Sequence, residues 1–216
     1  MSLATLLFLG AVAVSAGFAI TAAERGDGPG YALFKPLTTF IVLLGAAFLV
    51  LPAQPLYRSV IVLGLALSLA GDVLLLRPRL FAAGLGVFLL AQFTYLAAFS
   101  LGNPARAAQL PWLLPFVVAG AAVAGAVWGG LGRLRPAVLL YVAVAAGMVW
   151  RAAMRLELPT IPHPSAFHAM AGALLLMISD AILAVRRWRR PSRLGHALEL
   201  AAYWMGQFFI AMSVRR

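Results

Sequence analysis

Two aspartates in apolar surroundings are the residues of this sequence best suited to chemistry. Asp72 lies near the end of one long apolar segment, and Asp180 lies near the end of another. A charged side chain inside a membrane span costs roughly 3 kcal/mol or more, so such residues usually face a polar interior and mark a functional site. A carboxyl group there can donate a proton, accept one or bind a cation. The pair predicts acid–base catalysis or ion binding within a membrane.

Two further ionisable residues are expected near these carboxyls. Lys35 opens the second apolar segment, and Glu199 lies in the first turns of the last one. Both segments start from the side of the membrane at which the segments of the aspartates end. Four ionisable groups should therefore meet in one half of the membrane. Lys35 and Glu199 also fit a plainer interpretation, in which a long side chain near a helix end extends to the lipid headgroups.

Uncharged polar residues extend the predicted site toward the middle of the membrane. Many of them lie one or two helical turns from an ionisable residue, on the same face of the helix. The expected lining residues are Thr39, Ser68, Gln92, Tyr95, Tyr141, Ser179, Tyr203 and Gln207. The tyrosines also suit interfacial or packing positions, and the two serines also suit hydrogen bonds to helix carbonyls.

Other kinds of site are disfavoured by the residues present. The three histidines, His163, His168 and His196, lie at scattered depths, and the chain has no cysteine, so we expect neither a metal site nor a disulfide. No glycine-rich phosphate loop precedes a helix. Ser68 lacks the preceding glycine of a nucleophile elbow. We therefore expect no cofactor.

The segments that carry these residues are expected to be transmembrane helices. Of the 216 residues, 63% are hydrophobic and 11% are charged, whereas soluble domains average about 45–50% and 25%. Inside hydrocarbon, such runs can form all their backbone hydrogen bonds only as helices. The predicted class is an all-α integral membrane protein, one bundle and one domain over residues 1–216. Its eight expected helices span residues 2–22, 31–51, 58–76, 80–99, 111–128, 136–151, 164–185 and 194–214.

The positive charge predicts how the bundle is oriented. The net charge is +11, but the arginines lie between apolar runs, as in membrane proteins, and they form no surface for nucleic acid. Ten arginines lie in or next to the loops after the first, third, fifth and seventh helices, and six lie on the opposite side of the membrane. The first side should be cytoplasmic, with both termini outside. No basic residue precedes the run 3–23, so a retained first helix is expected in place of a cleaved signal.

A weak internal repeat divides the expected bundle into two four-helix halves. The segment 71–77 resembles the segment 179–186, and the helices that follow carry Gln92 and Gln207. Four helices per half would give the halves parallel orientations, related by an axis along the membrane normal.

Taken together, the intramembrane motifs resemble the YhhN family of multispanning membrane proteins, the lysoplasmalogenases. The motifs are Lys35-Pro36-Leu37-Thr38-Thr39, Gly64 to Asp72, Gly84-Leu85 with Phe88 and Tyr95, Tyr141 with Met148, Gly172-Ala173 with Ser179-Asp180, and Tyr203 with Gln207. The resemblance covers the second to the eighth helix. One departure is Gln92, where the family usually has a histidine.

The resemblance implies hydrolysis of the vinyl ether bond of lysoplasmalogens to a fatty aldehyde and a glycerophospho headgroup. Such bonds break when the alkene carbon is protonated and water attacks the resulting oxocarbenium ion. Two carboxyls divide the acid and base roles in the related cleavage of glycosides. Asp72 and Asp180 would be catalytic, in either order, and Lys35 would hold the phosphate. The implied partners are a lysophospholipid substrate and the lipid of a bacterial inner membrane. The polar cavity should open to the cytoplasm, because the arginine-rich loops flank it.

Two other functions fit the same residues. A transporter or channel would use the aspartates to bind protons or a cationic substrate, and a lipid-binding scaffold would use them without catalysis. A lipid hydrolase should have a cavity closed at one end and open laterally between helices, whereas a transporter should have a route to both faces. The sequence sets no oligomeric state.

Overall fold

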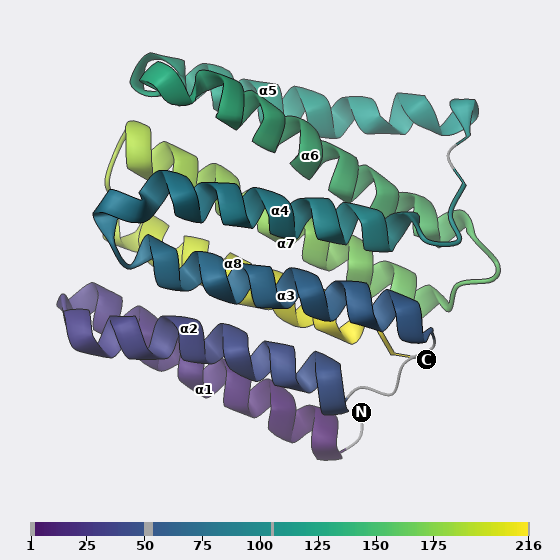
Figure 1. Ribbon diagram of the computed structural model, residues 1–216, viewed down its shortest axis with the longest axis horizontal. Coiled ribbons are helices and arrows are strands. Elements are labelled where there is room, and N and C mark those ends of the chain that lie inside the picture. Colours follow the sequence, from purple (N-terminus) through teal and green to yellow (C-terminus); the bar gives the residue numbers. More distant parts are fainter. Residues whose placement is uncertain (1–2, 50–53, 105, 216) are drawn as a thin grey trace.

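In the computed structural model, which describes residues 3–49, 54–104 and 106–215, the chain forms a bundle of eight α-helices without strands (Figure 1). The helices are α1 Leu3–Arg25, α2 Gly28–Leu44, α3 Pro55–Leu75, α4 Phe81–Ser100, α5 Leu114–Val127, α6 Arg135–Met154, α7 His163–Trp188 and α8 Arg193–Met212. The predicted all-α bundle is confirmed. Residue 2 and residues 50–51, at the ends of two expected helices, lie outside the described residues.

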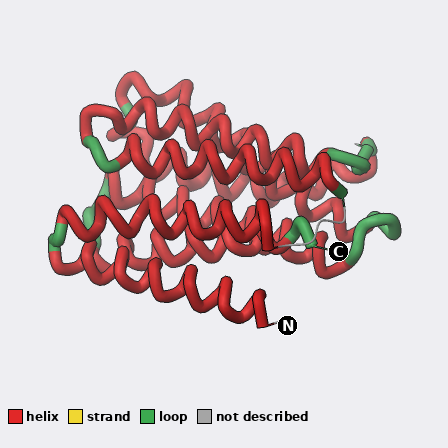
Figure 2. The backbone as a smooth tube through the Cα atoms, turned by 60° about the horizontal axis from the view of Figure 1, so that its bottom comes forward, coloured by secondary structure: helices red, strands yellow, loops and turns green. Residues whose placement is uncertain are grey.

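The helices run side by side, and both chain termini lie at the same end of the bundle (Figures 1 and 2). We call this the even end, because it also carries the loops after α2, α4 and α6. The odd end carries the loops after α1, α3, α5 and α7. Each loop of the odd end is short, which places consecutive helices antiparallel to each other.

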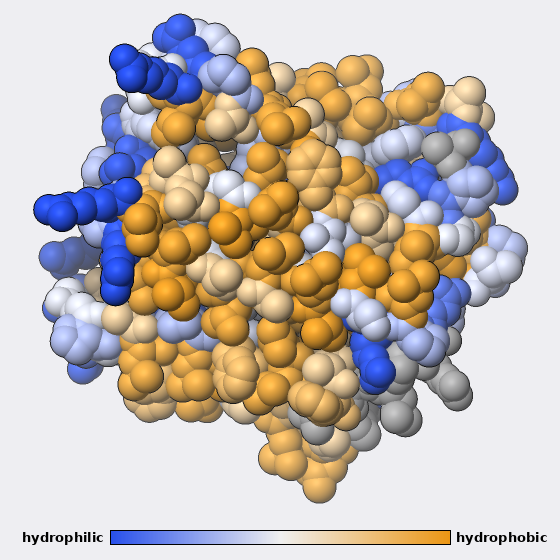
Figure 3. Space-filling view, in the orientation of Figure 1, coloured by the Kyte–Doolittle hydropathy of each residue, from blue (hydrophilic) through white to orange (hydrophobic). Residues whose placement is uncertain are grey.

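An apolar band surrounds the bundle between its two ends. Figure 3 shows hydrophobic side chains over the middle of the molecule and hydrophilic ones at either end. Seven helical segments among the described residues are long and apolar enough to cross a membrane. The eighth helix, α8, is less apolar because it carries Glu199, Tyr203 and Gln207, but all three side chains are buried inside the bundle.

Several helix ends differ from the prediction by about three residues, and three of these differences have local reasons. The expected end of the sixth helix at Arg151 is wrong: α6 continues to Met154, because the Arg151 side chain is buried and donates to the Asn103 carbonyl and the Ser100 hydroxyl. Residues 107–113 form 3-10 turns before α5, where prolines interrupt α-helical hydrogen bonding. On the odd side, α2 begins early because Asp27 caps it by accepting from the Gly30 amide at 3.0 Å.

The closest helix packing in the bundle depends on two glycines. A Cβ atom on Gly172 of α7 would lie 2.8 Å from the Gly206 carbonyl of α8, and one on Gly206 would lie 3.0 Å from the Gly172 carbonyl. Small residues of this kind let membrane helices approach backbone to backbone. This close approach joins α7, which carries Asp180, to α8, which carries Tyr203 and Gln207.

Candidate active site

Asp72, on α3, is held by one cation and two hydroxyl groups. The Lys35 Nζ of α2 lies 3.7 Å from its Oδ1. The Thr39 hydroxyl of α2 donates to Oδ2 at 2.5 Å, and the Tyr203 hydroxyl of α8 donates to the same oxygen at 2.9 Å. Asp72 is 1% exposed and Lys35 is 6% exposed. A buried ion pair with further hydroxyl donors is an arrangement that stabilises a carboxylate.

Asp180, on α7, has only neutral hydrogen-bond partners in the part of the chain that the structure describes. The Gln92 amide of α4 donates to Asp180 Oδ2 at 2.5 Å, and it also donates to the Tyr141 hydroxyl of α6 at 3.0 Å. Asp180 belongs to neither of the ion pairs found among the described residues, which are Lys35–Asp72 and Arg186–Glu199. The two aspartates therefore have chemically different environments.

The two aspartate sites follow one plan, in agreement with the proposed division into halves. In each half, α1–α4 or α5–α8, the third helix supplies the aspartate and the second helix supplies a partner. Lys35 of α2 is the partner of Asp72, and Tyr141 of α6 lies beside Asp180. The fourth helix of the other half supplies the remaining partner, Tyr203 or Gln92. The main chemical difference is that the second helix offers a cation to Asp72 and a phenol to Asp180.

A third polar group lies between α3, α4 and α8. The Tyr95 hydroxyl donates to Gln207 Oε1 at 2.7 Å and lies 3.4 Å from the Ser68 hydroxyl. Gly64 makes room for the Tyr95 ring, since a Cβ atom there would lie 2.3 Å from a ring carbon. Ser179, by contrast, donates to the Glu199 carbonyl at 2.9 Å, so its hydroxyl is used to join α7 to α8.

Two contributors to this region were missed by the sequence reasoning. Arg186, which was counted only as a loop charge, forms an ion pair with Glu199 across the turn between α7 and α8. The Trp204 indole donates to the Thr39 hydroxyl at 3.2 Å and so helps to orient it toward Asp72. Neither pairing follows a fixed sequence spacing, because both join different helices.

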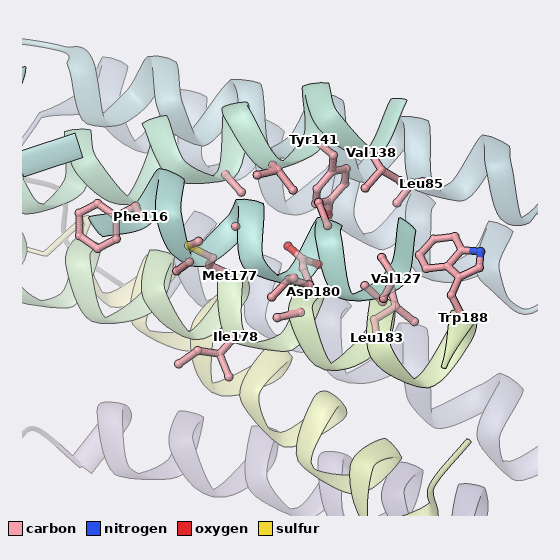
Figure 4. Close-up of a pocket in the computed structure, with 18 of the residues that line it drawn as sticks. Leu85, Phe116, Val127, Val138, Tyr141, Met177, Ile178, Asp180, Leu183 and Trp188 are labelled. Carbon is pink, nitrogen blue, oxygen red and sulfur yellow. The ribbon is translucent and has the colours of Figure 1, made fainter. Parts of the chain in front are cut away.

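A large apolar cavity, which we call the chamber, lies between α4, α5, α6 and α7. Its volume is about 200 Å³, and its walls include Phe81, Phe116 and Trp188. Tyr141 and Asp180 also line it, and Figure 4 shows both between Phe116 and Trp188, with the Asp180 carboxyl among apolar side chains. An alkyl chain is the kind of ligand that suits such walls.

Two small polar cavities adjoin the chamber and share Tyr141 and Asp180 with it. The first, which we call the polar pocket, has a volume of about 30 Å³; its polar lining residues are Lys35, Asp72, Tyr141, Ser179, Asp180, Glu199 and Tyr203. The second has a volume of about 10 Å³, and Ser68, Gln92, Tyr95 and Gln207 contribute to its walls. A cavity of about 10–15 Å³ is enough for one water molecule. Every residue of the sequence-predicted site lines one of these cavities, except Thr39, which bonds Asp72 directly.

Comparison with known proteins places the chain among membrane proteins of one family. The model of the YhhN family matches residues 30–214. The "Uncharacterized membrane protein YhhN" of Escherichia coli O6:H1 is 32% identical over 211 residues, which cover 94% of this chain and 96% of the relative. The protein of the same name from Shigella flexneri has the same identity and coverage. The "Lysoplasmalogenase homolog" of Dictyostelium discoideum is 28% identical over 93% of this chain and 83% of its own length. No solved structure matches. A family match over most of the chain, together with full-length relatives, means that this protein belongs to the YhhN family.

Proposed function

We propose that this protein hydrolyses the vinyl ether bond of lysoplasmalogens, releasing a fatty aldehyde and a glycerophospho headgroup. The observation that carries the proposal is the position of Asp180 and Tyr141, which line both the apolar chamber and the polar pocket. In a lysoplasmalogen the vinyl ether joins the hydrocarbon chain to the polar headgroup. With the chain in the chamber, that bond lies beside Asp180. The name of the Dictyostelium relative supports the same reaction.

The partners of the two aspartates suggest which one is the acid. Asp180 has neutral hydrogen-bond partners and borders an apolar cavity, so it is suited to carry the proton to be donated. Asp72 lies beside Lys35 and is suited to act as the carboxylate base. The sequence leaves this order open, and we propose Asp180 as the acid and Asp72 as the base.

The proposed reaction consumes one water molecule and proceeds in three steps. Asp180 gives its proton to the alkene carbon that is not bonded to oxygen, which leaves an oxocarbenium ion on the ether. Water attacks the carbon of this ion while Asp72 takes a proton from the water, and a hemiacetal forms. The hemiacetal then breaks its bond to the glycerol oxygen, which takes the proton held by Asp72, while Asp180 takes the hydroxyl proton of the hemiacetal. The aldehyde leaves, and both carboxyls return to their starting states. The polar pocket has room for the attacking water.

The shape of the cavities favours a hydrolase over a transporter. In the part of the chain that the structure describes, the three cavities bordering the aspartates are lined by helix residues, and none of these residues belongs to a loop of the even end. A transporter would need a route to both faces. The arginine-rich loops lie at the odd end, so we also propose that the polar pocket faces the cytoplasm.

The test is aldehyde release from a lysoplasmalogen by the purified protein in detergent. Asp72→Asn and Asp180→Asn should each lower kcat at least about 100-fold, since each removes a proton-transferring group. The double variant should be little worse than either single one, because the two groups act as a unit. Glu24→Gln, at an exposed carboxyl outside the cavities, is the matched control and should keep full activity. Near-normal turnover by both folded aspartate variants would overturn the proposal.

A further inference from the structure

A second group of polar residues lies at the even end, away from the aspartates. Arg151 lies in the last turn of α6, Arg155 lies one turn later in the 3-10 segment Arg155–Glu157, and each is 4% exposed. Arg151 donates to the Asn103 carbonyl and, through Nε, to the Ser100 hydroxyl at 3.2 Å. Its Nη1 is buried without a hydrogen-bond partner in the described part of the chain. Arg155 lies over the Tyr57 ring at 4.3 Å, and its buried Nε also lacks a partner there.

Among the described residues, no carboxylate forms an ion pair with either of these two arginines. The chain has six acidic residues, and Glu157 is the one in the sequence that lies at the even end. Its carboxylate accepts from the Gln109 amide at 3.0 Å, and neither ion pair among the described residues includes Arg151 or Arg155. A buried charge without a partner is strongly unfavourable. The geometry therefore calls for an anion from outside the chain.

A groove beside Arg151 has the form that an amphiphilic anion requires. Its volume is about 540 Å³, and it lies between α4, α5 and α6. Apolar residues line most of it, namely Leu96, Leu113, Val117, Ala143, Gly147 and Trp150, and Ser100, Asn103 and Arg151 form its polar end. The Asn103 Oδ1 is also buried without a partner among the described residues, so the polar end offers a hydrogen-bond acceptor beside the cation.

We propose that this groove binds a phospholipid with a hydroxyl-bearing headgroup. A phosphate oxygen accepts from the guanidinium of Arg151, a headgroup hydroxyl bonds the Asn103 side chain, and an acyl chain follows the apolar wall past Gly147; all three residues line the groove. A second copy of this chain is a poor occupant, because its even end carries one acidic side chain, Glu157, for several arginines. The site is separate from the aspartates, so it does not depend on the proposed hydrolysis.

The experiment measures binding of dioleoylphosphatidylglycerol to the purified protein by native mass spectrometry. Arg151→Gln should raise the Kd about tenfold or more, because it removes the charged donor. Gly147→Phe should raise it as well by filling the groove with Arg151 still present. A Cβ atom at Gly147 meets only Leu96 methyl groups at 3.8 Å, an ordinary contact, so this variant should fold even where Arg151→Gln does not. Gly125→Phe, on α5 with open space around it, is the matched control and should bind like the wild type.

Two further probes separate the headgroup from its parts. Inorganic phosphate, which lacks the chain, and dioleoylglycerol, which lacks the phosphate, should each bind far more weakly than the phospholipid. Wild-type affinity in Gly147→Phe would overturn the proposal. Inorganic phosphate that binds as well as the lipid would also overturn it, by indicating a site for soluble anions. Equal binding of dioleoylglycerol would overturn it by removing the role of Arg151.

Discussion

Replacing Lys35 with methionine should destabilise the protein through Asp72. The two charged groups lie 3.7 Å apart, with their side chains 8% and 1% exposed. At an effective dielectric constant of about 20, charges at this separation attract each other by roughly 4–5 kcal/mol. Methionine has a similar length but no charge, so it leaves Asp72 as a buried carboxylate without a cation. We expect a loss of about 3–5 kcal/mol in the free energy of unfolding.

The same reasoning predicts that a second change restores much of this loss. Lys35→Met combined with Asp72→Asn has no buried charge at this position, so it should be more stable than Lys35→Met alone. Asp180→Asn is the matched control, because Asp180 belongs to neither ion pair among the described residues. It should change the stability far less than Lys35→Met does.

The assay is equilibrium unfolding in detergent of the wild type, both single variants at positions 35 and 72, and the double variant. The four values form a double-mutant cycle, which isolates the energy of the pair from the separate effects of each change. A coupling energy near zero would refute the reasoning, since it would mean that Lys35 and Asp72 are not a charged pair in the folded protein. The assignment of Asp72 as the carboxylate base would then lose its physical basis.

Three other predictions concern the reaction and the orientation. Gln92→His keeps a hydrogen-bond donor for Asp180, so its rate of aldehyde release should stay within about tenfold of the wild type. Gln92→Leu removes the donor and should lower that rate about 100-fold. Ala119→Phe, in the chamber wall, should lower kcat/KM for long-chain substrates by about fourfold for each substrate methylene that it excludes from the chamber. Ala121→Phe, on α5 outside the chamber lining, is the control and should leave kcat/KM unchanged. A reporter fused within residues 186–193 should be cytoplasmic, and an external reporter would reverse the proposed orientation without affecting the chemistry.

The helices and the grouping of the polar residues were predictable from the sequence for one physical reason. In a membrane, hydrocarbon surrounds the bundle, so a polar side chain in the middle of a helix has no favourable place except the interior. Asp72, Asp180, Gln92 and Gln207 could therefore be expected to face inward before any contact was known. Asp72, Gln92 and Gln207 are buried, Asp180 is partly buried, and their hydrogen bonds to other helices follow from that constraint.

The pairings and the chamber were not predictable in the same way. The ion pair of Arg186 with Glu199 depends on how the turn between α7 and α8 directs two long side chains. The chamber is lined partly by α5, a helix whose apolar residues look the same in sequence whether they face lipid or a cavity. Arg151 looked like the charge that ends a span, and only the packing of the loop after α4 shows that it is buried.

The repeated plan of the two aspartate sites gives a physical reason why they can divide the work of one reaction. Two carboxyls in identical environments would compete for the same proton, and neither would be fixed as acid or base. Here the backbone plan is shared, but α2 presents Lys35 to Asp72, and α6 presents Tyr141 at the corresponding place beside Asp180. A single exchange of cation for phenol separates the two carboxyls electrostatically. Because Asp180, the one without the cation, also borders the apolar chamber, the proposed proton donor lies where the carbon to be protonated would be in the proposed reaction.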